Sequence, residues 1–142
     1  MRRFSVFKSR KLLKSSTLSA YKRVSDRKKI ESRLDSLFRQ IIKKRDKKCV
    51  RCGKDRNLQT SHIFSRSNKS VRWDENNAVL FCGYHHIFWW HKNPVEAISW
   101  IQKYLGSEKY EALKIKAGFV IHRNVNDLLF LEQELKEKLK EV

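Results

Sequence analysis

The chain has 142 residues and a formal net charge of +18 at pH 7. Because 40% of the residues are hydrophobic, it can build a core, which argues against disorder along the whole chain. A charge of this sign and size indicates a polyanionic partner, usually nucleic acid, since each phosphate contact releases a condensed counterion. Residues 1–56 hold 21 Lys and Arg against five Asp and Glu, which is 16 of the 18 net charges.

No run of about 18 apolar residues occurs in the sequence, so we expect no membrane span and no membrane partner. Met1 is followed by Arg2 and Arg3, but no apolar signal-peptide core comes after them. The three cysteines are an odd number, and two of them form a close C-x-x-C pair. Without an export signal, this pattern favours metal binding over disulfides and predicts an intracellular, reducing location.

The basic N-terminal part divides into an arm and a helix. Residues 1–24 alternate Lys and Arg with Ser and a few apolar residues, which predicts an arm that is disordered alone. Ser25 is a candidate N-cap for a helix ending at about Lys44. One apolar stripe with helical spacing supports this helix, formed by Ile30, Leu34, Leu37, Phe38, Ile41 and Ile42.

From Cys49 to His91 the pattern changes to short segments separated by turn residues. Strands are predicted for Leu58–Phe64 and Ala78–Phe81, joined by a polar connection over 65–76. A short helix is predicted for His85–Trp90.

The C-terminal part is predicted to be helical. Asn93 and Pro94 start a helix that Gly106 ends. Ser107 caps a shorter helix that closes at Gly118. The last helix runs from 126 to 141 and presents a leucine stripe, which is most often intramolecular core but allows a homodimer.

A zinc site is predicted from two paired knuckles. Cys49 and Cys52 form C-x-x-C, and Cys82 and His85 form C-x-x-H, which together supply the four ligands of a tetrahedral structural site. His86 is the alternative fourth ligand. A segment with two short strands buries little apolar area, so the metal is expected to supply much of its stability.

The same segment resembles a known family. The stretches C-V-R-C-G-K, L-Q-T-S-H-I and N-N-A-V-L-F-C-G-Y-H-H are similar to the HNH (ββα-metal) endonuclease motif. Asn77 precedes Cys82 by five positions and His86 by nine, which matches the family's spacing. Across roughly 49–104 the chain is also similar to phage recombination endonucleases of the NinG/Rap type.

The resemblance implies an α+β fold with a zinc-bound, treble-clef-like ββα-metal core. This core, at about 46–92, would be flanked by the basic helix and by C-terminal helices over 93–142, so that 25–142 form one nuclease domain. The implied activity is metal-dependent hydrolysis of DNA, duplex or branched, in the cytoplasm of a bacterial or phage-infected cell.

The family also implies roles for individual residues. His62 is the general base and Asn77 holds the loop that aims it. His86, with His91 or Asn77, holds a catalytic Mg²⁺ or Mn²⁺. Many HNH enzymes have a metal-binding Asp before the base, whereas this chain has Ser61, which makes His91 or Asp74 the candidate substitute.

Two further points concern the surroundings of this site. His91 follows His86 by five residues, about 140° around an α-helix, which is a poor alignment for two ligands. Three cations in the connection between the strands are candidates for phosphate contacts: Arg66, Lys69 and Arg72. Four aromatic residues fit base stacking or, more simply, core packing: Trp73, Phe88, Trp89 and Trp90.

Two other classes of protein explain the charge. One is a non-catalytic, zinc-stabilised nucleic-acid-binding protein, and the other is a basic structural protein of a ribonucleoprotein. The zinc-stabilised module also accounts for the cysteines. Only the nuclease hypothesis also accounts for His62 and Asn77 at their offsets from the knuckles.

Overall fold

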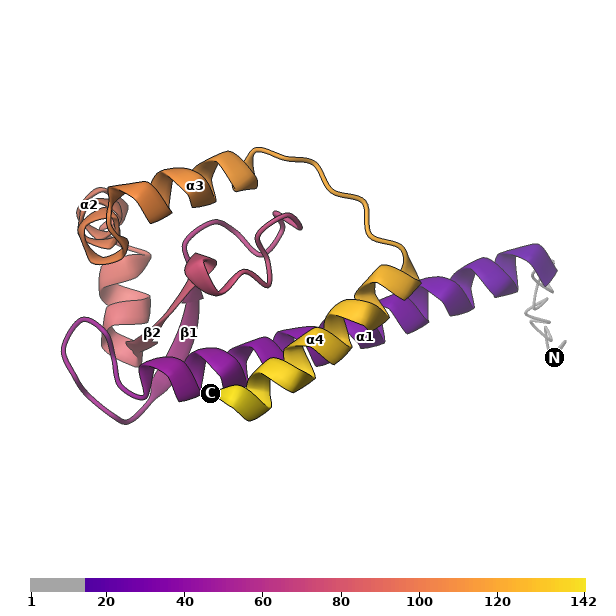
Figure 1. The fold of residues 1–142 in the computed structure, drawn as a ribbon, viewed down its shortest axis with the longest axis horizontal. Helices are drawn as coiled ribbons and strands as arrows, with labels where there is room; N and C mark the ends of the chain where they lie inside the picture. The colour runs from indigo at the N-terminus through magenta and orange to yellow at the C-terminus, as the bar shows by residue number, and fades with distance from the viewer. Residues whose placement is uncertain (1–14) are drawn as a thin grey trace, which may run out of the picture.

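The computed structural model describes residues 15–142, with side chains from Asp26 onward. Most of the arm predicted over residues 1–24 therefore lies outside the described residues. The fold is α+β, with helices around a small two-stranded sheet (Figure 1). None of the helices between residues 15 and 142 has the length and apolar character needed to cross a bilayer. The elements in chain order are α1 (Ser15–Asp46), β1 (Leu58–His62), η1 (Glu75–Asn77), β2 (Ala78–Cys82), η2 (His85–Trp90), α2 (Pro94–Leu105), α3 (Ser107–Ala117) and α4 (Val125–Glu141).

Helix α1 is longer than the sequence pattern predicts, because it begins at Ser15 and not at Ser25. Residues 15–24 contain no Gly or Pro, so nothing in them breaks a helix that is already formed further along. Extending an existing helix adds one hydrogen bond for each residue ordered, which is far easier than nucleating a new one. The predicted boundary between arm and helix at residue 24 is therefore wrong.

The sheet pairs β1 with β2 in antiparallel register, with His62 opposite Ala78 and Leu58 opposite Cys82. Every residue of β2 is buried, so both faces of this short sheet are covered. Ala78 and Leu80 face the core formed with α1 and α4. The alternate residues Val79 and Phe81 face a second core. Strand β1 leaves its outer edge unpaired within the described residues, and the candidate site lies along this edge.

The predicted apolar stripe of α1 is the centre of the first core. Phe38, Ile41 and Leu34 are at most 1% exposed and pack against Leu128 and Leu135 of α4. Helix α4 lies beside α1 and runs in the same direction, so the two ends of the described chain cover the sheet from the same side (Figure 1). The leucine stripe of α4 is thus intramolecular core.

The second core lies on the other face of the sheet, under η2, α2 and α3. Phe81 packs against Trp89 and Trp90 of η2 and against Trp100 of α2. The three C-terminal helices agree with the predicted ones to within one residue at most ends. Ser107 is the first residue of α3 and Gly106, with φ +85°, is its cap. Trp73 and Trp89 are both buried in the cores, as the packing interpretation predicts, whereas Phe88 is 50% exposed.

One buried acid joins α4 to α1. Glu132 is 4% exposed and accepts both guanidinium hydrogen bonds of Arg33, at 3.0 and 2.8 Å, and its carboxylate also pairs with Lys136 at 3.0 Å. Hydrogen bonding to Arg33, opposed by burial and assisted by Lys136, lowers the pKa of Glu132 to about 2. Its charged form therefore stabilises the contact between the two helices.

Replacing Glu132 with Gln is expected to lower the free energy of unfolding by about 1–2 kcal/mol at pH 7, since Arg33 and Lys136 are half-exposed and screened. The folded pKa is below the ordinary value of 4.5, so this contribution is complete above about pH 4.5 and is lost as the pH falls towards 2. Urea titrations at several pH values measure it. Glu134→Gln, on the exposed side of the same helix, is the matched control, and equal effects of both variants at pH 7 would contradict the assignment.

Candidate functional site

Four side chains converge at the end of the sheet: Cys49, Cys52, Cys82 and His85. Their ligand atoms all lie within 4.8 Å of one another. The two thiols of Cys52 and Cys82 are 3.8 Å apart, and His85 Nδ1 is 3.3 Å from Cys82 Sγ. A tetrahedral zinc with bonds of about 2.3 Å to sulfur separates two sulfur ligands by about 3.8 Å. The cluster is therefore compatible with a structural zinc site, and His85, not His86, is its fourth member.

Backbone turns hold the two knuckles in place. Gly53 N donates to Cys49 O at 2.8 Å, and Gly53 has φ +74°, a left-handed conformation that favours glycine. Gly83 N donates to Asn57 O at 2.8 Å, and a Cβ at Gly83 would lie 2.4 Å from the Asn57 amide nitrogen. Glycine at both places lets the chain turn tightly enough to direct all four side chains to one point.

The pKa shifts of Cys49 and His85 favour their metal-binding forms, whereas burial raises the pKa of Cys52. Burial raises the pKa of Cys49, but backbone N–H groups that include those of Cys82 and Arg51 outweigh it and lower the pKa overall. Burial, with Arg51 and Lys54 nearby, lowers the pKa of His85. A thiolate and a neutral imidazole are the forms that bind metal.

His62 is the last residue of β1 and lies on the face of the sheet that α1 covers. Its ring centroid is 5.5 Å from that of Phe38 on α1. His62 Nε2 is 2.9 Å from the carbonyl oxygen of Arg72, and a carbonyl can only accept, so Nε2 carries the proton and Nδ1 is the basic nitrogen. Burial, then the charge of Arg66, lowers the pKa of His62, although the Arg72 carbonyl opposes the shift. His62 is thus a neutral imidazole with one free lone pair.

Asn77 organises the loop beside His62. Its side chain is fully buried, accepts a hydrogen bond from Phe64 N at 2.7 Å and donates to the carbonyls of Phe64 and Val71 at 3.0 and 2.9 Å. These three bonds join the end of β1 to the start of β2 across the intervening loop. They agree with a positioning role, and because they occupy the buried amide, Asn77 is not available as a metal ligand.

Ser61, His86 and His91 form a contiguous set on the other side of β1. His86 Nδ1 lies within hydrogen-bond distance of Ser61 Oγ, and His86 Nε2 is 3.3 Å from His91 Nε2. When Nδ1–H donates to Ser61, the free lone pair of His86 is on Nε2 and faces His91. Burial and His91 lower the pKa of His86, which favours its neutral form.

The helical geometry of η2 explains why these two histidines meet. The segment His85–Trp90 is a π-helix, in which the backbone hydrogen bond joins residues five apart. Residues five apart then lie one turn apart on the same side, so His86 and His91 converge. The 140° separation expected for an α-helix does not apply here.

Asp74 does not join this set. Its carboxylate caps η1 by accepting from Asn76 N and forms an ion pair with Lys116. Among the residues whose side chains are described, only the Cys–His cluster brings three or more His, Cys, Asp or Glu ligands together. The second candidate centre therefore consists of two imidazoles and one serine hydroxyl. Ser61, which the sequence marked only as a missing ligand, holds the ring of His86.

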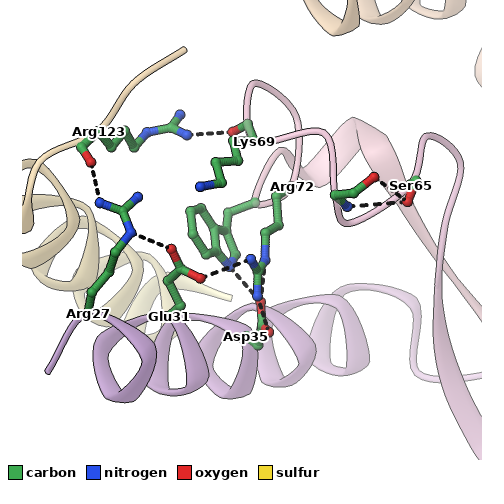
Figure 2. A network of polar contacts seen from close by, with 9 residues as sticks. Arg27, Glu31, Asp35, Ser65, Lys69, Arg72 and Arg123 are labelled. Atoms are coloured by element: carbon green, nitrogen blue, oxygen red, sulfur yellow. Dashed lines mark hydrogen bonds and ion pairs between the residues drawn. The ribbon is translucent and has the colours of Figure 1, made fainter. Parts of the chain in front are cut away.

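The three cations predicted to bind phosphate have different environments. Arg72 is 14% exposed, and its guanidinium pairs with Asp35 at 2.7 Å and with Glu31 at 3.3 Å on α1 (Figure 2). It is therefore a structural residue, and its prediction as a DNA contact is corrected. Lys69 is exposed but lines a hollow with residues 117–122. Arg66 is exposed and lines the same hollow as His62.

Two adjoining hollows open between α1 and β1. The larger, about 390 Å³, is lined by His86, by α1 residues that include Lys43, and by β1. The smaller, about 90 Å³, is lined by His62 and Arg66. Arg39 and Thr60 line both, so the two hollows share a wall, with His86 in the larger and His62 in the smaller. We call these two adjoining hollows the groove. The sequence marks Arg39 and Lys43 only as cations on a polar helix face, with no signal that this face borders the histidines.

Comparisons of the chain with protein-family models, with curated proteins and with solved structures found no match.

Proposed function

We propose that this protein is a metal-dependent DNA endonuclease of the HNH type, stabilised by a structural zinc. The observation that carries the proposal is the arrangement around β1. A neutral His62 with a free Nδ1 lies on one side of the strand, and the paired imidazoles of His86 and His91 lie beyond its edge. The first group can take a proton from water, and the second can hold an ion.

His62 is proposed as the general base. The Arg72 carbonyl holds the proton on Nε2 and directs Nδ1 away from the hydrogen bond, and Phe38 restricts the ring from the α1 side. A base with a lowered pKa is unprotonated at neutral pH, so it can accept the proton of the attacking water. Asn77 keeps the loop that supplies the Arg72 carbonyl in place.

His86 and His91 are proposed as ligands of the catalytic ion. Two nitrogens bound at about 2.1 Å to one ion lie about 3.0–3.4 Å apart, and the observed separation of 3.3 Å supports this assignment. The bound ion would polarise the scissile phosphate and stabilise the leaving 3′ oxygen. Ser61 fixes the His86 ring through Nδ1, which is the role that second-layer acceptors have in metal sites.

The experiment is cleavage of labelled linear, nicked, flapped and four-way-junction DNA with added Mg²⁺ or Mn²⁺. Because the centre offers imidazoles and no carboxylate, we expect Mn²⁺ to support cleavage better than Mg²⁺. Preference for the junction would support the finer proposal of a recombination endonuclease, acting as a monomer or homodimer. Absence of cutting with every substrate and ion would refute the nuclease.

A second candidate function is a zinc-stabilised nucleic-acid-binding module without catalysis. It is favoured by one observation: the Cys–His cluster is the sole group of three or more such ligands among the side chains described. Metal stoichiometry separates the two functions. The nuclease holds one tightly bound zinc and a weaker divalent ion that is lost in the double variant His86→Ala, His91→Ala, whereas the binding module holds the zinc alone.

Arg66 is expected to set the acid limb of the pH–rate profile. Its charge helps to lower the pKa of His62, and cleavage requires neutral His62, so the rate rises with pH through that lowered pKa. Arg66→Ala should move this limb to higher pH, towards the ordinary histidine value of 6.5. Rates measured at saturating DNA and Mn²⁺ between pH 5.5 and 8 test this, with Lys69→Ala from the same loop as the matched loss of charge. Equal profiles for both variants would contradict it.

A further inference from the structure

Helix α1 borders the candidate site along its C-terminal half. Ser36, Arg39, Gln40 and Lys43 recur at helical spacing on one exposed face, and together with β1 they line the hollow of about 390 Å³ that contains His86. Arg39 also lines the smaller hollow with His62. The polar face of α1 is thus one wall of the groove in which both histidines open.

The cations of this wall differ from their neighbours on the same helix. Arg27 pairs with Glu31, Arg33 with Glu132 and Arg45 with Asp46. Within residues 26–142, neither Arg39 nor Lys43 forms an ion pair.

The groove contains one carboxylate, that of Asp35, and Arg72 and the Trp73 indole already bind it. The positive charge of the wall is therefore left for a ligand from outside.

We propose that this groove seats the phosphodiester backbone of DNA, with Arg39 on the phosphate between the two histidines and Lys43 on a neighbouring phosphate. The inference rests on the proposed function and adds its substrate-positioning residues. The planar fork of Arg39 can donate to two phosphate oxygens at once, whereas the Lys43 ammonium acts as a point charge. The smaller hollow, at about 90 Å³, is too small for a base but admits phosphate oxygens and water.

The wall extends along the helix beyond the hollows. Lys28 is exposed and lies 11 residues before Arg39, which places it on the same face about 16 Å away. A backbone that follows this face therefore meets a further cation beyond the hollows. Helix α1 would thus hold DNA at the point of cleavage and beyond it.

The test compares Arg39→Ala and Lys43→Ala with Lys109→Ala, which removes one exposed helical charge from α3. Binding of a short duplex is measured against salt for the full chain with its zinc and no added divalent ion. Each phosphate contact contributes about 0.9 to the slope of log K against log salt, so each groove variant should lower the slope by about that amount and Lys109→Ala should leave it unchanged. Arg39 and Lys43 are exposed and make no ion pair among residues 26–142, so both variants should fold, which circular dichroism checks.

Cleavage with Mn²⁺ at saturating DNA distinguishes the two proposals. Arg39→Ala should lower the rate about a hundredfold, because a donor directed at the reacting phosphate is lost, while Lys43→Ala weakens binding with a nearly normal maximal rate. If the wild-type chain cuts but both variants match Lys109→Ala in slope and rate, the groove proposal is overturned and the nuclease stands. If nothing cuts but the slope falls in both variants, the groove binds DNA and the nuclease is overturned.

Discussion

Replacing His62 with Ala is expected to reduce DNA cleavage by about a hundredfold to ten-thousandfold, with zinc content and DNA affinity unchanged. His62 is the one histidine in the described residues whose proton is fixed on Nε2 by a backbone carbonyl, that of Arg72. Its Nδ1 is therefore always the nitrogen that takes a proton from water. Loss of a well-positioned general base lowers the cleavage rate by this factor, because bulk water is a poor substitute for it.

The measurement is single-turnover cleavage with Mn²⁺, beside a fluorescence binding curve. His62→Gln is the companion variant, since its amide retains a donor for the Arg72 carbonyl but cannot accept the proton of water at neutral pH. His122→Ala removes an exposed histidine from the α3–α4 connection and is the matched control. Full activity in His62→Gln would disprove the base, and loss of folding in His62→Ala alone would assign His62 a structural role.

Replacing Cys49 with Ser is expected to unfold the central part of the chain at physiological temperature. Structural zinc sites contribute about 10–16 kcal/mol in small zinc modules, which equals or exceeds the net stability of an ordinary domain. The region between α1 and α2 has a sheet of two five-residue strands, and the metal would join the loop after α1 to the end of β2. Cys82→Ser should have the same effect, because Cys82 is the last residue of β2.

Two adjacent histidines provide the control. His85 lies in the Cys–His cluster and His86 contacts Ser61, so single Ala variants separate the two centres. His85→Ala should lose zinc and melt at lower temperature, whereas His86→Ala should retain both zinc and stability and lose cleavage. Zinc content by mass spectrometry and thermal melts followed by circular dichroism measure both effects. A Cys49→Ser chain that stays fully folded without zinc would disprove the structural site.

Much of the architecture follows from local patterns. The apolar stripe from Ile30 to Ile42 predicted α1 and its buried face, and the short apolar segment Ala78–Phe81 predicted β2. The two knuckles predicted the cluster at the end of the sheet, because C-x-x-C and C-x-x-H each place two ligands on one side of a tight turn. These patterns act over a few residues, so the sequence alone contains them.

Contacts between distant segments were beyond the reach of these patterns. Arg72 has the charge and the loop position of a phosphate-binding residue. Its guanidinium instead donates hydrogen bonds to Glu31 and Asp35 on α1, which lie more than thirty residues earlier in the sequence (Figure 2). Likewise, the sequence could not choose between His85 and His86 for the zinc cluster. The choice depends on where η2 meets β1, which brings Ser61 to His86 and leaves His85 near Cys82.

The sequence by itself determined the charge, the three cysteine ligands and the faces of the helices, because composition, spacing and periodicity are local properties. Only the tertiary structure decided that His86 and His91 converge, since a π-helical turn and not an α-helical one forms under the packing of Trp89 on Phe81. Only the tertiary structure placed Arg39 and Lys43 of α1 at the hollows that contain the histidines. The reason is that the face of a helix that borders a site depends on what its opposite face buries. Here the burial of Phe38 and Leu34 against the sheet and α4 orients α1 and leaves Arg39 at the groove.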